Sequence, residues 1–459
     1  MKLHQNIRSS MSFAPTARSC AYIAAGLVLT LGGLAACKDS SLLQVTDPDV
    51  LPLAGFNTPA GADPLRIGVI GDFTTGFDGN SDGYTVQVGN MSDELITSDT
   101  FNDRLEINAR QSIEVNSTTQ GVYTNLQRAR ANADAAIKIL VTTQPTPTFN
   151  RGELYMLRGY SEMFLGEAFC SGVPFSGEDG TTRTYGTPQT TNQIMIRAAA
   201  SFDSAIALAD TSKRVLYGAE IGKARALLNQ GSFAGIAAVV ANVPQSFQLL
   251  TYHDATAGSN GMWGAADNGS TRYEVTTSEG INGLPFLADH SDPRMSWTPS
   301  SRNGFNSSFV KLPTENKYGR YSSGIVDDGI DAKLMGIEAN LNAGAGSQAS
   351  FDAEYAALNT LRASGPPTGV PAMTTGSPTT MTAAVTLLYR ERAYWNYLSG
   401  HRLGDMRRLV QIYKRDAEQV FPTGGFAPPL IGNYGTSTNI VIPQSERNNP
   451  NFQGCLPGA

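Results

Sequence analysis

The stretch GVYTNLQRARANADAAIKIL, residues 121–140, decides the fold class of this chain. Its apolar residues recur at steps of three and four, the spacing that puts side chains on one face of an α-helix. They are Val122, Leu126, Ala129, Ala133, Ile137 and Leu140. The next stretch, ELYMLRGYSEMFLGEAF at residues 153–169, has the same spacing, and Gly172 and Pro174 then stop the helix. We therefore expect an antiparallel pair of helices.

Two further helical stretches follow. QIMIRAAASFDSAIALAD, residues 193–210, keeps the helical spacing, and so does GKARALLNQGSFAGIAAVVANV, residues 222–243, which we expect Gly231 to split into two shorter helices. Successive helix pairs rich in alanine resemble tetratricopeptide-type units. The strict repeat consensus is absent, so an ordinary helical domain explains the periodicity equally well.

Residues from about 251 to 330 differ from the helical stretches on either side. Helical periodicity disappears, and large aromatic residues are spread among glycine, asparagine and serine. Helical spacing resumes over residues 330–344, 350–365 and 381–420, with a loop rich in proline, threonine and glycine at residues 366–380. The sequence thus predicts a mostly α-helical fold with long irregular loops and an aromatic, loop-rich insertion.

The composition excludes several classes of protein. The chain has 459 residues, of which 41% are hydrophobic and 16% charged, with a formal net charge of −6. These values describe a folded, slightly acidic body rather than a disordered tail. Nothing in the sequence is basic enough to indicate binding to nucleic acid.

Residues 1–36 have the layout of a bacterial signal peptide. Arg8 and Arg18 supply positive charge, and the segment CAYIAAGLVLTLGGLAA, residues 20–36, contains no charged residue. It ends in Leu-Ala-Ala followed by Cys37, which resembles the lipobox, where a peptidase cuts and the cysteine receives a diacylglycerol. We expect the mature chain to begin at a lipidated Cys37. A membrane-spanning anchor is the alternative, but small residues before the cysteine fit a cleavage site better.

The mature chain begins with a polar, turn-rich segment, residues 37–64, which is typical of an extended tether. Beyond it, Cys170 and Cys455 are the two cysteines left to the mature fold, because Cys20 leaves with the signal peptide. Two cysteines outside the cytosol favour one disulfide bond. Two buried free thiols are the alternative.

Four segments occur in an order that points to one family. They are RGELYMLRGYSEMFLGEAFCSGVPFS at residues 151–176, GIEANLNAG with SFDAEYAALNTLRA within residues 336–363, RERAYWNYLSGHRLGDMRRLV at residues 390–410 and IPQSERNNPNFQ at residues 442–453. Each resembles an element of the SusD/RagB family of outer-membrane nutrient-binding lipoproteins. Two departures concern fine packing: Leu398-Ser399 stands where many members have Phe-Glu, and Leu403 where an aromatic residue is common.

The resemblance implies a single SusD-like domain over residues 65–459, with tetratricopeptide-like helix pairs as the scaffold and long loops that bind nutrient. Family members sit at the cell surface over a TonB-dependent (SusC-like) outer-membrane transporter and capture oligosaccharides or, in some branches, peptides. The resemblance therefore implies a lipid-anchored protein of the outer membrane that is not an enzyme. Lys38 and Asp39 are similar to a short signal that directs some such lipoproteins outward.

The late helical segment contains a cluster of charged residues. Asp405 lies three residues from Arg402 and Arg408 and four from His401, a spacing that brings side chains together on a helix. A catalytic His-Asp pair needs a nucleophile within reach, so in view of the resemblance we interpret the cluster as a structural network of ions and hydrogen bonds.

The sequence has no HExxH, no clustered Cys/His spacing, no G-x-S-x-G, no P-loop and no dinucleotide fingerprint. We therefore predict neither a metal site nor a cofactor. Two alternatives to a binding protein stay open. One is a surface glycoside hydrolase, because sequence does not give the distance between two carboxyl groups. The other is a helical-repeat scaffold protein without a small ligand.

The insertion contains the candidate ligand-binding residues. Sugars have apolar faces and hydroxyl rims, so their sites combine flat aromatic rings with polar groups. We predict aromatic platforms at Trp263, Tyr273, Trp297, Tyr318 and Tyr321, with polar groups from Asp267, Asn268, Arg272, Asn303 and Arg320. Phe101, in the segment SDELITSDTFNDR, is a further candidate because family members also use loops from that region. Packing of these rings against the scaffold is the alternative.

Overall fold

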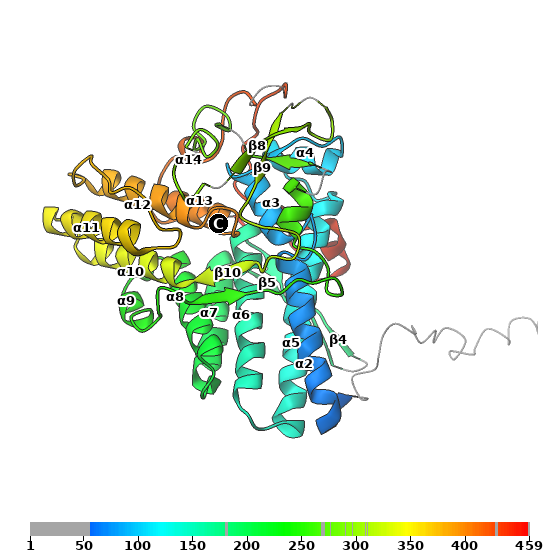
Figure 1. Cartoon of the computed structure of the whole chain (residues 1–459). Coiled ribbons are helices and arrows are strands. Elements are labelled where there is room, and N and C mark those ends of the chain that lie inside the picture. The colour runs from blue at the N-terminus through cyan, green and yellow to red at the C-terminus, as the bar shows by residue number, and fades with distance from the viewer. Residues whose placement is uncertain are drawn as a thin grey trace, which may run out of the picture. The chain divides into compact units, whose positions relative to one another are not determined.

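Helices α5 (Ser117–Thr143) and α6 (Phe149–Ala168) confirm the first predicted helix pair. The side chain of Asn116 starts α5 by accepting a hydrogen bond of 3.0 Å from the amide of Thr119. Residues 144–148 then turn the chain, so that α5 and α6 pack side by side, as Figure 1 shows. The apolar stripe of α5 is buried along its whole length against its neighbours.

The computed structural model describes residues 56–457, apart from 180–181, 268–270, 276, 290, 296, 308, 310 and 427–429. The predicted signal peptide, the predicted lipid site Cys37 and most of the predicted tether lie outside the described residues.

Helices α7 (Thr191–Leu208) and α8 (Lys213–Asn229) form the second pair. Thr190 and Gln193 start α7 with reciprocal hydrogen bonds. Helix α8 begins before the predicted residue 222, but its end is as predicted, because Gly231 follows it with a φ of 70°. The short helix α9 (Ile236–Val239) comes next.

Close packing in this array depends on two glycines. The ring of Phe202 in α7 lies between Gly159 of α6 and Gly222 of α8. A Cβ atom at Gly159 would lie 2.8 Å from Cε1 of Phe202, and one at Gly222 would be closer still. The missing side chains therefore leave room for the ring between the two helices, and a larger residue at either position would overpack the core.

Helix α2 (Pro59–Phe77) was not predicted, and it begins inside the segment that we interpreted as a tether. It packs against α5 and α6. Val69, Phe73 and Phe77 are buried, and the ring of Phe77 stacks on that of Phe164 with centroids 5.2 Å apart. The helical array therefore starts before residue 65.

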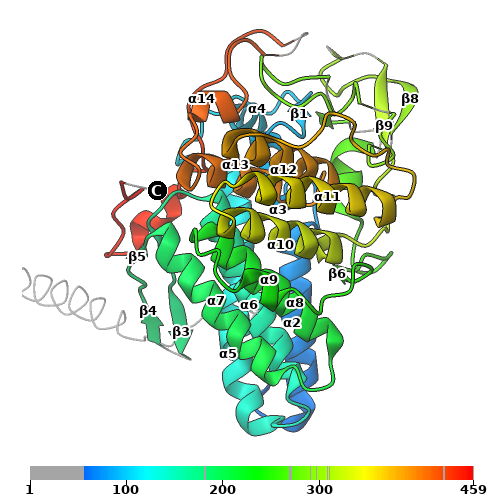
Figure 2. The same cartoon turned by 90° about the vertical axis from the view of Figure 1, so that its left-hand side faces the viewer.

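A second group of helices follows the insertion, and Figure 2 shows it beside the first group. It consists of α10 (Gly329–Ala343), α11 (Gln348–Ser364), α12 (Met381–Trp395), α13 (Arg402–Gln411) and α14 (Ala417–Val420). The predicted helical stretch 381–420 is thus three helices. Helix α10 packs against α8 and α9 and so joins the two groups.

Strands are short and pair two by two, all antiparallel, in the part of the chain that the structure describes. The pairs are β1 (Ile96–Thr97) with β7 (Tyr273–Glu274), β2 (Val173–Pro174) with β5 (Pro188–Gln189), β3 (Gly177–Asp179) with β4 (Thr182–Thr184), β6 (Gln248–Leu250) with β10 (Ile325–Asp328), and β8 (Trp297–Arg302) with β9 (Leu312–Glu315). The prediction of a mostly helical scaffold with long irregular loops is confirmed.

The irregular segments gather at one end of the helices, which we call the loop end. It contains the β8–β9 hairpin, α3 (Tyr84–Met91), α4 (Asn102–Asn108) and the π-helix η3 (Trp263–Asp267). Figures 1 and 2 both place β8, β9 and α4 together at this end. No helix among the described residues has the length and apolar character needed to cross a bilayer.

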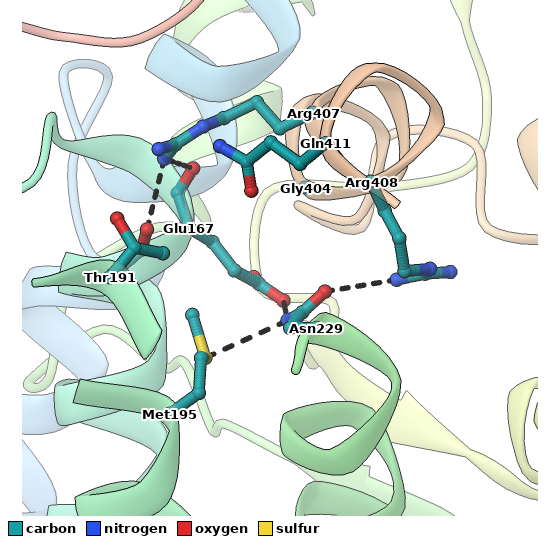
Figure 3. Close-up of a pocket in the computed structure, with 9 residues that line it drawn as sticks. Glu167, Thr191, Met195, Asn229, Gly404, Arg407, Arg408 and Gln411 are labelled. Atoms are coloured by element: carbon teal, nitrogen blue, oxygen red, sulfur yellow. Dashed lines mark hydrogen bonds between the residues drawn. The ribbon is translucent and has the colours of Figure 1, made fainter. Parts of the chain in front are cut away.

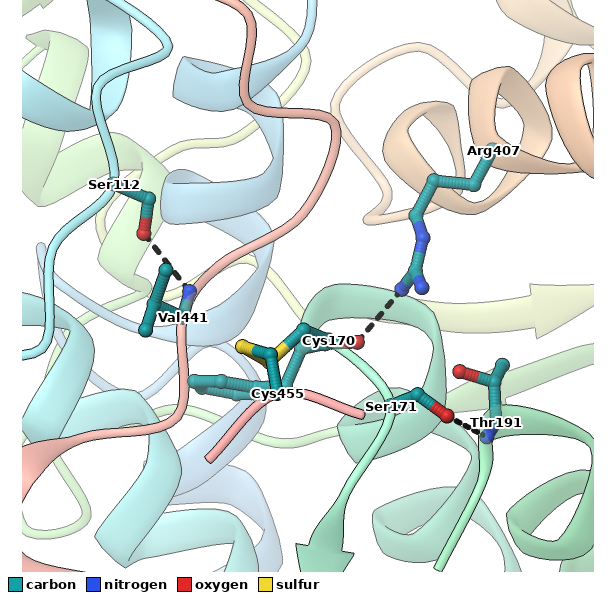
Figure 4. The surroundings of a disulfide bond; sticks show 8 residues. Ser112, Cys170, Ser171, Thr191, Arg407, Val441 and Cys455 are labelled. Carbon is teal, nitrogen blue, oxygen red and sulfur yellow. Dashed lines mark hydrogen bonds between the residues drawn. A yellow bond between two sulfur atoms is a disulfide. The ribbon is translucent and has the colours of Figure 1, made fainter. Parts of the chain in front are cut away.

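The C-terminal segment returns to the end of α6. Cys170 and Cys455 form a disulfide bond with Cα atoms 5.5 Å apart (Figure 4). The amide of Cys170 also donates a hydrogen bond of 2.8 Å to the carbonyl of Ile440. The 3₁₀-helix η4 (Gln444–Asn448) lies between these two anchoring points.

Candidate functional site

Buried ion pairs join α10, α12 and α13 in the middle of the protein. Arg392 donates two hydrogen bonds, of 2.8 and 3.0 Å, to the carboxylate of Asp405 and forms an ion pair of 3.0 Å with Asp331. Burial raises the pKa of Asp405, but the charges of Arg392 and Arg408 outweigh it and hold that pKa below its usual value. The carboxylate is therefore ionised and fully paired.

His401 belongs to the same network. Its Nε2 lies 2.7 Å from Asp327 and 3.5 Å from Asp331. Burial and the charge of Arg225 lower its pKa, but the two aspartates outweigh them and raise it to about 9. These three side chains have the spacing of a metal site. A protonated imidazole offers no lone pair to a metal, however, and Arg225 and Arg392 already neutralise the carboxylates.

One detail of the predicted cluster is wrong. Asp405 does pair with Arg408, at 2.9 Å, but His401 and Arg402 turn to carboxylates of other segments. Arg402 donates hydrogen bonds of 2.6 and 2.8 Å to Asp93. The reason is that both residues lie at the N-terminal end of α13, where carboxylates from outside the helix are closer than the next turn. The charges of the network pair with one another, which is the arrangement expected of a structural network.

The loop end holds the residues predicted to bind ligand, and two of them are in the core. Tyr273 has no exposed surface, and its hydroxyl accepts a hydrogen bond of 2.9 Å from Gln87. Tyr318 is 4% exposed. Neither ring presents a face to solvent, so we leave both out of the proposed site. Trp297 lies partly buried at the start of β8 and interacts within the protein, so it is left out as well.

Trp263 and Tyr321 are brought together by one arginine. The guanidinium of Arg320 lies 5.5 Å from the ring centre of Trp263 and 5.1 Å from that of Tyr321. Trp263 is partly buried and Tyr321 is exposed. We call these three residues the Trp263 patch.

Phe101 lies in a second cluster of this kind, which sequence reasoning found only in part. Arg104 lies over the ring of Phe101, at 5.5 Å, and Arg272 lies over that of Phe305, at 3.9 Å. Both guanidinium groups bond to Asp99, with Arg272 Nη1 donating at 2.8 and 2.9 Å. We call these five residues the Phe101 patch.

Strand pairing positions the Phe101 patch. Thr97 of β1 pairs with Tyr273 of β7, which brings the segment before α4 against the segment before β7. The rings of Phe101 and Phe305 are 43% and 47% exposed, so each keeps a large accessible surface. Burial raises the pKa of Asp99, but hydrogen bonds from Arg104 and Arg272 outweigh it, so that the pKa is lower than usual.

A hollow of about 420 Å³ lies between α4 and residues 426 and 430–433, and it is lined by Asn102, which follows Phe101 in the chain. Its walls combine apolar side chains with amides and the carboxylate of Glu106, and they include Asn102, Leu105, Asn108, Gln111, Phe426, Leu430 and Asn433. Apolar surface with a few convergent amides is the composition expected of a small-molecule site. The hollow could not be predicted from the sequence, because its two walls are more than three hundred residues apart in the chain.

The polar residues predicted to bind ligand, like the aromatic ones, lie partly in the two patches and partly outside them. Arg272 and Arg320 lie in the two patches, and Asn303 is exposed. The side chains of Asp267 and Asn268 lie outside the described residues. The prediction did not include Phe305, which is exposed. Its neighbours Asn303, Gly304 and Asn306, which are typical of a turn, were the signal that could have indicated this exposure.

Fold and loop end together define a helical scaffold with exposed aromatic rings at one end. No protein-family model and no curated protein matches the sequence. Among solved structures, a SusD superfamily protein from Bacteroides fragilis is similar, with a TM-score of 0.65 at 13% identity over 86% of this chain and 99% of that one. A SusD-like carbohydrate-binding protein from Bacteroides fragilis has a TM-score of 0.60 at 14% identity, over 87% and 99%. B. fragilis NanU has a TM-score of 0.63 at 12% identity, over 89% and 99%.

The chain therefore has the SusD-like fold over nearly its whole described length. This confirms the resemblance to the SusD/RagB family at the level of the fold, including the tetratricopeptide-like arrangement of its helix pairs.

Proposed function

We propose that this protein binds oligosaccharide at its loop end. The observation that carries the proposal is the Phe101 patch: two exposed rings flank an ionised carboxylate and two guanidinium groups, beside a hollow lined by apolar and amide groups. Rings match the apolar faces of a sugar, and the ionic and amide groups match its hydroxyls. The Trp263 patch is a second platform in the same proposal.

The charge state of Asp99 favours binding of a sugar over its hydrolysis. A glycoside hydrolase needs one carboxylic acid that donates a proton to the leaving group. Asp99, the carboxylate of the Phe101 patch, has a lowered pKa because two guanidinium groups hydrogen-bond to it. A carboxylate held ionised in this way is a poor proton donor.

We further propose that the mature protein is anchored at the outer membrane, on the cell surface, by lipid on Cys37, and that it passes its ligand to a TonB-dependent, SusC-like transporter. The lipobox-like sequence and the SusD-like fold support this proposal. Labelled palmitate should enter the wild-type protein in cells and not the Cys37→Ser variant. The wild-type protein should also copurify with a transporter of this class, and the absence of any such partner would contradict the proposal.

Binding is tested by titration calorimetry with glucan, mannan and xylan oligosaccharides, and with peptide pools as the second ligand class. Phe101→Ala and Phe305→Ala should each weaken binding roughly tenfold, because each removes a ring at the centre of the site. Tyr185→Ala is the matched control, since Tyr185 is 42% exposed but follows β4, away from the loop end in both views (Figures 1 and 2).

Two outcomes would contradict the proposal. Release of shorter sugars, detected by chromatography after incubation, would identify a hydrolase instead. Binding that both phenylalanine variants leave unchanged would place the site elsewhere, and the same measurements on Trp263→Ala would then test the Trp263 patch.

A further inference from the structure

A polar groove lies between the N-terminus of α7 and the C-terminal ends of α8 and α13, apart from the Phe101 and Trp263 patches. Its volume is about 530 Å³, and its walls include Thr191, Asn192, Asn229, Gln230, Gln411 and Lys414. No aspartate or glutamate lines it among the described residues. A small cavity of about 10 Å³, whose lining Figure 3 shows, shares Thr191, Asn229 and Gln411 with the groove and therefore adjoins it; we call it the inner cavity. That is room for one oxygen-sized atom.

Arg407 brings an incompletely paired cation to this inner cavity. Its side chain is buried, and its Nη1 donates to the carbonyls of Gly166, at 2.9 Å, and Phe169, at 3.0 Å. Its Nε and Nη2 have no hydrogen-bond partner among the described residues. Burial lowers its pKa to about 10, so the guanidinium is still charged at neutral pH.

Among the described residues that line the inner cavity, Glu167 supplies the carboxylate, and that carboxylate is already hydrogen-bonded within the protein. Glu167 accepts hydrogen bonds of 2.8 and 2.7 Å from Arg225 and another of 2.7 Å from Asn229. Figure 3 shows its carboxylate turned to Asn229 and away from the guanidinium of Arg407. Glu167 therefore leaves Nε and Nη2 of Arg407, which carry three N–H groups, without a partner among the described residues. Buried N–H groups rarely lack a partner unless a ligand or water binds them.

Two further features of the groove favour the binding of a negatively charged group. Thr191 is the first residue of α7, a helix of 18 residues whose N-terminus attracts anions, and its buried Oγ1 has no partner among the described residues. Lys414 adds a positive charge to the wall of the groove. A hydroxyl, a guanidinium, an ammonium and a helix N-terminus thus converge where no free carboxylate opposes them.

We propose that this groove binds an oxyanion, a carboxylate or sulfate group, with one oxygen in the inner cavity at Arg407 and Thr191 and the rest of the ligand beside Lys414. Such a group occurs on acidic saccharides and as a free small anion. The proposal does not depend on the loop-end site, because it shares no residue with the Phe101 or Trp263 patch.

Titration calorimetry of the full chain at constant ionic strength tests the proposal with three probes: sodium D-glucuronate, sodium sulfate and D-glucose. Glucuronate is expected to bind and glucose is not. Sulfate binding as tight as glucuronate binding would identify a free-anion site, whereas tighter glucuronate binding would identify an acidic sugar as the ligand. Phe101→Ala should leave all three results unchanged, which separates this site from the loop-end site.

Variants avoid Arg407, because its loss would leave the carbonyls at the end of α6 unpaired. Thr191→Val keeps the shape and removes the hydroxyl, and should weaken anion binding roughly tenfold. Lys414→Gln should weaken it roughly threefold. Lys138→Gln makes the same charge change at an exposed position on α5 and should have no effect. The proposal is overturned if neither anion binds, if glucose binds equally, or if Lys138→Gln weakens binding as much as Lys414→Gln.

Discussion

Arginine side chains are used in opposite ways in the central network and at the loop end. In the network, Arg392 is fully buried and bonds to Asp331 and Asp405. At the loop end, Arg320 is exposed and lies over the rings of Trp263 and Tyr321. In the first arrangement the guanidinium faces buried carboxylates, and in the second it lies at the surface, beside exposed rings.

The difference separates structure from binding. A guanidinium paired with carboxylates in the core holds helices together and is unavailable to a ligand. One that lies on an exposed ring costs little desolvation and presents N–H groups beside an apolar surface, as a sugar site requires. Arg272 is intermediate, because it both bonds to Asp99 and covers Phe305.

The largest expected effect comes from breaking the central network. Arg392→Met would remove the arginine that pairs with buried Asp331 and one of the two arginines that pair with buried Asp405, so we expect the free energy of unfolding to fall by about 3–5 kcal/mol. The matched control is Arg390→Met, two residues earlier, which breaks a half-exposed pair with Asp289 and should cost less than about 1 kcal/mol. Urea unfolding measures both. Equal losses would show that burial of the pair does not matter.

The pH dependence of stability tests the same network at His401. Its pKa is raised to about 9 in the folded protein, from 6.5. The resulting stabilisation is fully present below pH 6.5 and is lost as pH rises through 9, at up to about 1.4 kcal/mol per pH unit. His401→Gln should cost about 1.5–3 kcal/mol at pH 6 and much less at pH 10. A cost that stays constant over this range would contradict a charged His401.

The fold was predictable where a single stripe of side chains is buried. Helix α5 shows its apolar spacing because one of its faces meets the core and the other is polar. Helix α2 escaped notice because Pro64 lies inside it and because apolar residues lie on its outer face as well, such as Ile67, which is 59% exposed. Helix formation there depends on packing against α5 and α6 rather than on its own sequence pattern.

The site was predictable only as a region. Tyr273 and Phe101 are both aromatic residues in polar segments, yet one is buried and the other exposed. The burial of Tyr273 is tied to Gln87, 186 residues earlier, and that contact is invisible in one sequence. The partners of His401 are equally remote, since Asp327 lies 74 residues before it. Local spacing finds pairs on one helix, but these sites are assembled from several.

A third prediction concerns a carboxylate that is buried as in the central network but has no arginine beside it in the described part of the chain. Glu354 of α11 is 3% exposed, and neither of its oxygens has a hydrogen-bond partner among the described residues. Burial raises its pKa from 4.5 to about 8. The buried, protonated side chain therefore costs no stability below pH 4.5, and the free energy of unfolding decreases as pH rises from 4.5 to 8. Glu354→Gln should therefore match the wild type at pH 5 and melt at a higher temperature at pH 8. Asp352→Asn, at an exposed position of the same helix, should show no such gain. A gain for Glu354→Gln that is independent of pH would mean that ionisation is not its cause.

The smallest effect on stability is expected at the loop end. Arg320→Met keeps an unbranched side chain over Trp263 and Tyr321 but removes the charge, so the free energy of unfolding should change by about 0.5–1 kcal/mol, the value of an exposed cation–π contact. If the Trp263 patch is a platform for sugar, the same variant should weaken oligosaccharide binding severalfold, because the lost N–H groups lie next to the rings. Thermal melting and titration calorimetry on one preparation separate the two effects. Lys311→Met, at another exposed cation of the insertion, is the control. A loss of stability as large as that of Arg392→Met, with affinity unchanged, would show that Arg320 has the structural role of the central arginines and would remove the Trp263 patch from the proposed site.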